Sequence, residues 1–199
     1  MSTRLRRLGS EALILAGVVV VSLAARSTLA DHYYIPSESM EHSLLVGDRV
    51  VVDKTAYGLR IPFTDIKLAE GASPGHGEIV IFDSPESGVR LIKRVVAVAG
   101  DTVEVHAGKL TINGVRMESD TAADLEVFGE RQATLNMAGG GGPELEPTVV
   151  PSGTVMVMGD NRGNSRDSRA FGFIPVGAIY GHAVRLYYRR GNGFVWRPI

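Results

Sequence analysis

The chain has 199 residues, of which 44% are hydrophobic and 22% are charged, and a formal net charge of −1. This length suits one domain with a small satellite, and the composition excludes bulk disorder. A net charge near zero gives no electrostatic reason to expect a nucleic-acid partner. Cysteine is absent, and the five histidines lack the spacing of a helical metal pair, so we expect neither a metal nor a cofactor.

The amino terminus combines basic and apolar residues. Three arginines, at positions 4, 6 and 7, precede an apolar run from Ala12 to Ala25. As a helix this run would measure about 21 Å, against about 30 Å of membrane hydrocarbon, whereas the segment Leu8 to Ala30 is long enough to span. The arginines would place the amino terminus in the cytoplasm. A transmembrane anchor and a cleaved secretory signal fit these residues equally well, and either would export the rest of the chain.

Beyond residue 30 the sequence favours β-structure. Short runs rich in branched residues alternate with turns, and Asn113-Gly114 is a strong hairpin signal. No strong helical period follows, so we predict a mainly β fold with an antiparallel catalytic core, preceded by one N-terminal transmembrane helix. The predicted strands are residues 49–52, 78–82, 91–99, 102–105, 109–112, 115–117, 154–158, 184–188 and 194–196.

A four-glycine run at residues 139–142, followed by three prolines, indicates a loop at the edge of an insertion. We therefore divide the chain into three parts. Residues 1–30 would form the cytoplasmic tip and anchor, and residues 31–101 and 154–199 the catalytic β core. Residues 102–153 would form a smaller inserted β subdomain.

Polar residues concentrate in three places, at positions 35–40, 91–96 and 159–169. In the second of these segments, residues 91–96, Lys93 and Arg94 lie inside a predicted apolar strand, where they must point to opposite faces. A buried lysine loses its charge readily, which arginine does not, and a neutral lysine can act as general base for a serine nucleophile. A lone lysine in a strand is more often simply solvent-exposed.

These residues, taken together and in this order, resemble the bacterial type I signal peptidases, the serine–lysine proteases of the leader peptidase family. The resemblance runs from Ile35 to Ala183. It comprises Pro36-Ser37-x-Ser39-Met40, then residues 47–58, then Ile92-Lys93-Arg94 closed by Gly100-Asp101, and finally residues 159–173. Four ordered blocks behind an N-terminal apolar segment form a highly specific signal.

The resemblance implies a role for each matching residue. Ser39 would be the nucleophile and Lys93 its general base. The backbone N–H of Ser39 and the hydroxyl of Ser37 would form the oxyanion hole, and Ser165 would orient the lysine amine. Five further residues are expected to shape the site, with a structural polar turn as the alternative for the four in the last block: Arg94, Asp160, Arg162, Asp167 and Arg169.

The nucleophile segment departs from the family pattern. His42 stands where the family has proline, Ser43 replaces threonine, and Glu38 occupies a position often held by glycine. His42 could instead serve as the base of a Ser–His enzyme, but no matched acid partner is evident.

The resemblance further implies a membrane-bound endopeptidase that removes signal peptides from exported preproteins with small residues at the first and third positions before the cut. We expect a single-pass protein of the inner (plasma) membrane, in contact with the lipid bilayer, with its catalytic domain on the periplasmic face. Other classes are a self-cleaving repressor of the LexA type, which would need a DNA-binding domain, and a non-enzymatic exported β-domain. A specialised conjugation or pilin peptidase is a closer alternative.

Overall fold

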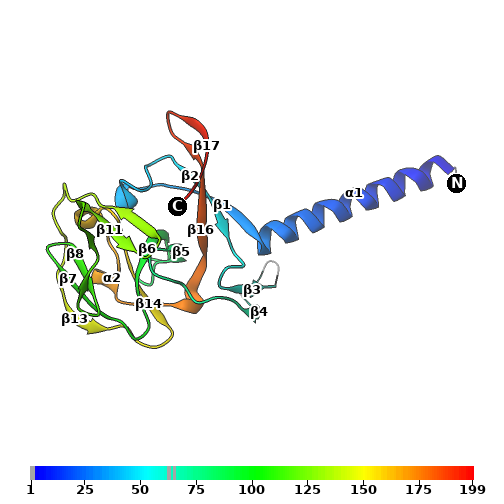
Figure 1. Cartoon of the computed structure of the whole chain (residues 1–199). Helices are drawn as coiled ribbons and strands as arrows, with labels where there is room; N and C mark the ends of the chain where they lie inside the picture. The colour runs from blue at the N-terminus through cyan, green and yellow to red at the C-terminus, as the bar shows by residue number, and fades with distance from the viewer. Residues whose placement is uncertain (1–2, 62–63, 65) are drawn as a thin grey trace.

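Figure 1 shows a long N-terminal helix that projects from a β-rich domain. In this computed structural model, which describes residues 3–61, 64 and 66–199, helix α1 (Thr3–Thr28) leads into strand β1 (Ala30–Tyr34). The apolar side chains of α1 between Leu13 and Leu23 are exposed and do not pack on the domain.

The helical conformation expected at the amino terminus is therefore present. In the part of the chain that the structure describes, however, no helix is both long enough and apolar enough to cross a membrane. The expected transmembrane helix is thus not confirmed.

The domain is built on one large antiparallel sheet. Its strands follow the order β1, β2, β16, β5, β6, β14 and β15, and β17 pairs with β16. The bounds are Arg49–Asp53 for β2, Ile79–Asp83 for β5, Arg90–Val98 for β6, Thr154–Met158 for β14, Ile174–Pro175 for β15, Ile179–Arg189 for β16 and Gly193–Pro198 for β17. The mainly antiparallel β fold predicted from the sequence is confirmed.

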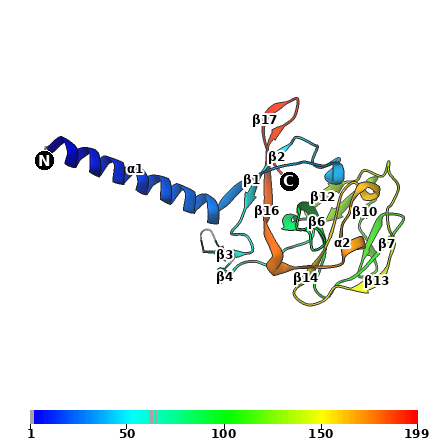
Figure 2. The same cartoon turned by 180° about the vertical axis from the view of Figure 1, so that it is seen from behind.

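Three smaller sheets complete the domain. β3 (Gly58–Arg60) pairs with β4 (Lys67–Glu70). β7 (Thr102–His106), β8 (Lys109–Ile112), β9 (Val115–Arg116) and β13 (Leu145–Val149) form one sheet, and β10 (Glu118–Ser119), β11 (Ala122–Phe128) and β12 (Arg131–Thr134) form another. Figure 2 shows these last two sheets at the end of the domain remote from α1. Their strands all lie within the predicted insertion 102–153, whose exact bounds stay a prediction.

Local sequence explains the turns and the short helices. Asn113 and Gly114 have φ of 52° and 78°, the conformation that a tight hairpin between β8 and β9 requires and that asparagine and glycine tolerate best. The chain also forms α2 (Ser168–Phe171) and three single-turn 3₁₀ helices, η1 (Glu38–Met40), η2 (Arg162–Asn164) and η3 (Val176–Ala178).

The buried core reaches the segment that carries Ser39. Met40 and Leu44 are fully buried against Val50, Ile79 and Ile81 of the large sheet. A second group of buried side chains, from β6, β14 and the two remote sheets, joins the insertion to the large sheet. The segment that carries Ser39 is therefore anchored to the large sheet by apolar burial.

The four-glycine run at residues 139–142 is packed rather than free. A Cβ atom at Gly141 would clash with the backbone of Ala107 and Gly108, and one at Gly142 would clash with the carbonyl oxygen of Arg162. Only glycine allows such close approach between two backbones.

We predict that Gly141→Ala lowers the free energy of unfolding by about 1–3 kcal/mol, since overpacking against rigid backbone forces a shift of the chain. Gly177→Ala is the matched control, because nothing lies within 4 Å of the added Cβ. Chemical denaturation of the two variants checks this. Equal stability of both variants would contradict the close packing of this loop.

Candidate active site

Ser39 lies in the single turn η1, immediately after an extended stretch of backbone. Ser37, which precedes the turn, has φ −139° and ψ 163°. The backbone ahead of the turn is tied to the loop ahead of β2 by hydrogen bonds from Ile35 N to Asp48 O (2.9 Å) and from Gly47 N to Ile35 O (3.0 Å). Ser39 is 8% exposed. The hydroxyl is thus held in a fixed position at the edge of a buried region.

Lys93 meets this hydroxyl from the centre of the large sheet. Its Nζ donates a hydrogen bond of 2.6 Å to Ser39 Oγ, and the residue is only 2% exposed. Lys93 lies on β6 opposite Val80 of β5, and its neighbours Ile92 and Val95 are buried. The solvent-exposed alternative for this lysine is therefore wrong.

Burial changes the acidity of the lysine. Loss of solvation lowers the pKa of Lys93 from 10.5 to about 8, while the negative charges of Asp167 and Asp160 raise it and the positive charge of Arg169 lowers it. Desolvation has the larger effect on the pKa, because the ammonium form loses more hydration free energy on burial than it gains from its attraction to two distant carboxylates. The amine is thus a base that is available close to neutral pH.

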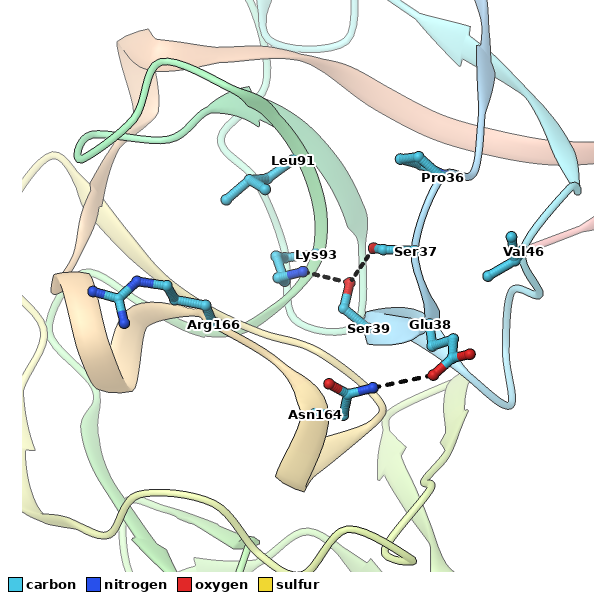
Figure 3. Close-up of a pocket in the computed structure, with 9 residues that line it drawn as sticks. All are labelled: Pro36, Ser37, Glu38, Ser39, Val46, Leu91, Lys93, Asn164 and Arg166. Carbon is cyan, nitrogen blue, oxygen red and sulfur yellow. Dashed lines mark hydrogen bonds between the residues drawn. The ribbon is translucent and has the colours of Figure 1, made fainter.

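A pocket of about 530 Å³ opens onto this pair, as Figure 3 shows. Ser37 Oγ lies 3.3 Å from Ser39 Oγ, on the opposite side from Lys93. A hydroxyl in that place can donate to an oxygen that develops charge beside the nucleophile. The lining residues are Pro36, Ser37, Glu38, Ser39, Val46, Leu91, Lys93, Asn164 and Arg166.

The polar loop after β14 lies against the backbone of the turn that carries Ser39. Asn161 N donates to Ser39 O (3.1 Å), and Asn161 Nδ2 donates to Glu38 O (3.2 Å). A Cβ atom at Gly159 would overlap both Ser39 O and Ser165 Oγ, so only glycine lets the loop come this close. The sequence did not predict these positions of Gly159 and Asn161, which it showed only as part of a motif.

Ser165 lies beside this glycine, close to the nucleophile segment. Its Oγ is buried and has no hydrogen-bond partner of normal geometry among the described residues, although it lies close enough to Asp167 to help lower the pKa of that carboxyl. Lys93 Nζ donates to Ser39 instead, so the expected hydrogen bond between Ser165 and the lysine amine is not seen.

Two buried ion pairs hold the same loop in place. Arg94 donates to both carboxylate oxygens of Asp160, at 2.9 and 2.7 Å. Arg162 likewise forms a bidentate ion pair with Glu126 of β11, and it also donates to Gly108 O. Glu126 was not a candidate from the sequence, because nothing in the pattern of the insertion predicts that its side chain turns inward.

A third buried ion pair, between Asp167 and Arg169, lies at the carboxyl-terminal end of the same loop. Asp167 accepts from Arg169 Nε and Nη2 at 2.8 Å each and from Gly159 N at 3.0 Å. Burial raises the pKa of Asp167, but these hydrogen bonds and the charge of Arg169 lower it by more, so its pKa lies below the ordinary value. Arg169 also donates to Gly141 O (2.6 Å), which ties the four-glycine loop to the site.

The insertion contacts the nucleophile segment directly. Leu135 forms a backbone bridge with His42, and the next residue, Asn136, forms one with Asn161. The partners of Ser39 Oγ among the described residues are Lys93 and Ser37, so the alternative base His42 has no hydrogen bond to it. Within the same part of the chain, no group of three or more acidic or histidine residues is arranged to hold a metal ion.

Comparison with known proteins decides the family. The model of the family described as "Signal peptidase, peptidase S26" matches residues 6–188. The chain belongs to this family. The expected identity as a type I signal peptidase, a hydrolase, is thereby confirmed.

Relatives of this peptidase come from bacteria and from plants. The signal peptidase I of Pseudomonas aeruginosa is 36% identical, over 85% of this chain and 69% of the relative. The probable signal peptidase I-1 of Synechocystis is 33% identical, over 88% of this chain and 80% of the relative. The thylakoidal processing peptidase 1 of Arabidopsis thaliana is 36% identical over 85% of this chain, which spans only 45% of that relative.

Solved structures of other proteins are also similar to this chain. A crystal structure of a signal peptidase I from Enterococcus faecalis is 31% identical, with a TM-score of 0.40, over 56% of this chain and 97% of that one.

We predict that Arg94→Met lowers the free energy of unfolding of the peptidase by about 3–5 kcal/mol, since it leaves the carboxylate of Asp160 buried and unpaired. Arg166→Met is the control. Arg166 makes an equally bidentate pair with Glu86, but at the surface, where water screens the two charges and the pair contributes little to stability. Urea denaturation measures both, and similar losses in the two variants would show that burial of the first pair is unimportant.

Proposed function

We propose that this peptidase removes signal peptides from exported preproteins, with Ser39 as nucleophile and Lys93 as general base. The observation that carries the proposal is the 2.6 Å hydrogen bond between a buried amine and a serine hydroxyl at the floor of an open pocket. Membership of the signal peptidase family supports the choice of substrate.

The lysine can do this work because it is partly neutral. With a pKa of about 8, roughly a tenth of the amine is unprotonated at pH 7, which is a few hundred times more than for an ordinary lysine. The neutral amine accepts the proton of Ser39 as the oxygen attacks the scissile carbonyl. The resulting ammonium then donates the proton to the leaving amine. Water, activated by the same lysine, hydrolyses the acyl-enzyme and frees Ser39.

Charge on the carbonyl oxygen needs donors that are already in place. In our proposal the Ser37 hydroxyl and the Ser39 N–H supply them, because both belong to the rigid segment that the buried Met40 anchors. Donors that need no rearrangement stabilise the transition state more than the ground state. Asp160, Arg162, Asp167 and Arg169, with Arg94, act by fixing the loop that lies against the Ser39 backbone, and Ser165, within the same loop, lies beside Gly159.

Helix α1 would attach the catalytic domain to a membrane. Its exposed apolar side chains and its projection from the domain support this part of the proposal. Attachment to the inner membrane, with the amino terminus in the cytoplasm, would keep the peptidase near membrane-tethered preproteins and so raise their effective concentration. The extended cleavage segment of a preprotein would add to a strand edge at the pocket.

We predict that Ser39→Ala and Lys93→Ala each reduce cleavage of a preprotein by a factor of 10³ or more, on the order of the loss seen when a nucleophile or its base is removed. His42→Ala is the matched control and should keep substantial activity. Product mass and initial rate measure the effect, and circular dichroism checks the fold. Full activity of either dyad variant, or an equal loss in His42→Ala, would refute the assignment.

The pH dependence should report the lysine. Since only neutral Lys93 is a base, kcat/KM should rise with pH and level off above an apparent pKa near 8. The His42→Ala variant should give the same curve. A rising limb centred near the ordinary pKa of histidine, about 6.5, would instead identify an imidazole as the base.

A further inference from the structure

The active-site pocket is lined by three side chains that can bear charge: Lys93, Arg166 and Glu38. Lys93 is buried and donates to Ser39, and in the proposed reaction it is the neutral form of this amine that takes part. Arg166 donates through Nε and Nη2 to both carboxylate oxygens of Glu86, at 2.6 and 2.7 Å. The third is Glu38, which directly precedes the nucleophile.

The carboxylate of Glu38 has no cation beside it. Its hydrogen bond comes from Asn164 Nδ2 at 3.2 Å, and an amide carries no net charge. Among the residues that the structure describes, Glu38 forms no ion pair. Asn161 Nδ2 additionally donates to the backbone oxygen of Glu38, so both the backbone and the carboxylate are held in place at the rim of the pocket.

The pocket is divided by the Ser39–Lys93 pair. In Figure 3, Leu91 and Pro36 lie on one side of the pair, whereas Glu38 and Asn164 lie on the other. The first side is apolar and suits the small residues that end a signal peptide. The second side is polar and is left for the first residues of the mature protein, which follow the scissile bond.

We infer that Glu38 is a specificity residue of the peptidase: it favours preproteins with a basic side chain at the first two positions after the scissile bond and disfavours acidic ones there. This inference rests on the proposed function and names a preference of the same site. Arg166 does not cancel the preference, because its charge is already paired with Glu86.

The expected size follows from the exposure of the carboxylate. Because Glu38 is exposed, water screens its interaction with a substrate ammonium, and a single exposed pair changes an equilibrium by a factor of about 1.4 to 5. Between a lysine and a glutamate substrate, the attraction and the repulsion combine to a ratio in kcat/KM on the order of fivefold. The ratio should shrink as salt rises, since mobile ions screen charges at the surface.

The experiment uses the full-length peptidase and three preproteins that are identical except for the two residues after the cut, which are both Ala, both Lys or both Glu. We expect the order Lys, Ala, Glu in kcat/KM at low salt. Glu38→Gln should bring the Lys-to-Glu ratio close to one, and Glu38→Lys should reverse it. Glu41→Gln is the matched control: it removes the same charge three residues away, outside the pocket lining, and should leave the ratio unchanged.

The outcomes separate the two proposals. If the peptidase cuts none of the three preproteins, the proposed function fails. If it cuts the Ala preprotein but the Lys and Glu preproteins react equally, or if Glu41→Gln changes the ratio as much as Glu38→Gln, the inference about Glu38 is overturned and the proposed function stands.

Discussion

The structure depends on keeping an amine out of water beside a serine hydroxyl. Strand β6 carries Lys93 into the middle of the large sheet, and the chain must bring Ser39 to it across 54 positions of sequence. Burying an ammonium is unfavourable, so the lysine gives up part of its proton affinity. Burial that disfavours the ammonium thus leaves part of the amine neutral near neutral pH, which the proposed mechanism requires.

The surrounding residues hold that contact in place. Arg94, the neighbour of Lys93 on β6, points to the other face of the strand and fixes Asp160. Asp160, Asn161 and Gly159 then place the loop against the backbone of Ser39. One strand thus supplies both the amine that contacts Ser39 and the anchor for the loop against the Ser39 backbone, through two adjacent residues that face in opposite directions.

Much of this could be predicted from the sequence, since the informative residues obey local rules. Branched runs such as residues 79–82 and 154–158 form strands almost wherever they occur, and Asn113-Gly114 specifies its own turn. The sequence did not predict β1, β3, β4, β10 to β13 or β15, because these segments are short, polar or mixed and gain strand structure only from the neighbours they pair with. The pairing of Arg162 with Glu126 was missed for a related reason: it joins residues far apart in sequence, and no local pattern encodes it.

The two backbone bridges from Leu135 and Asn136 have a consequence for how such a domain can vary. These adjacent residues join the insertion to the nucleophile segment on one side and to the loop after β14 on the other. The insertion therefore contacts both the Ser39 segment and the loop after β14, and is not a peripheral addition to the domain. Because Leu135 pairs with His42 and Asn136 pairs with Asn161, a change in chain length at these two positions would alter the spacing between the Ser39 segment and the loop after β14.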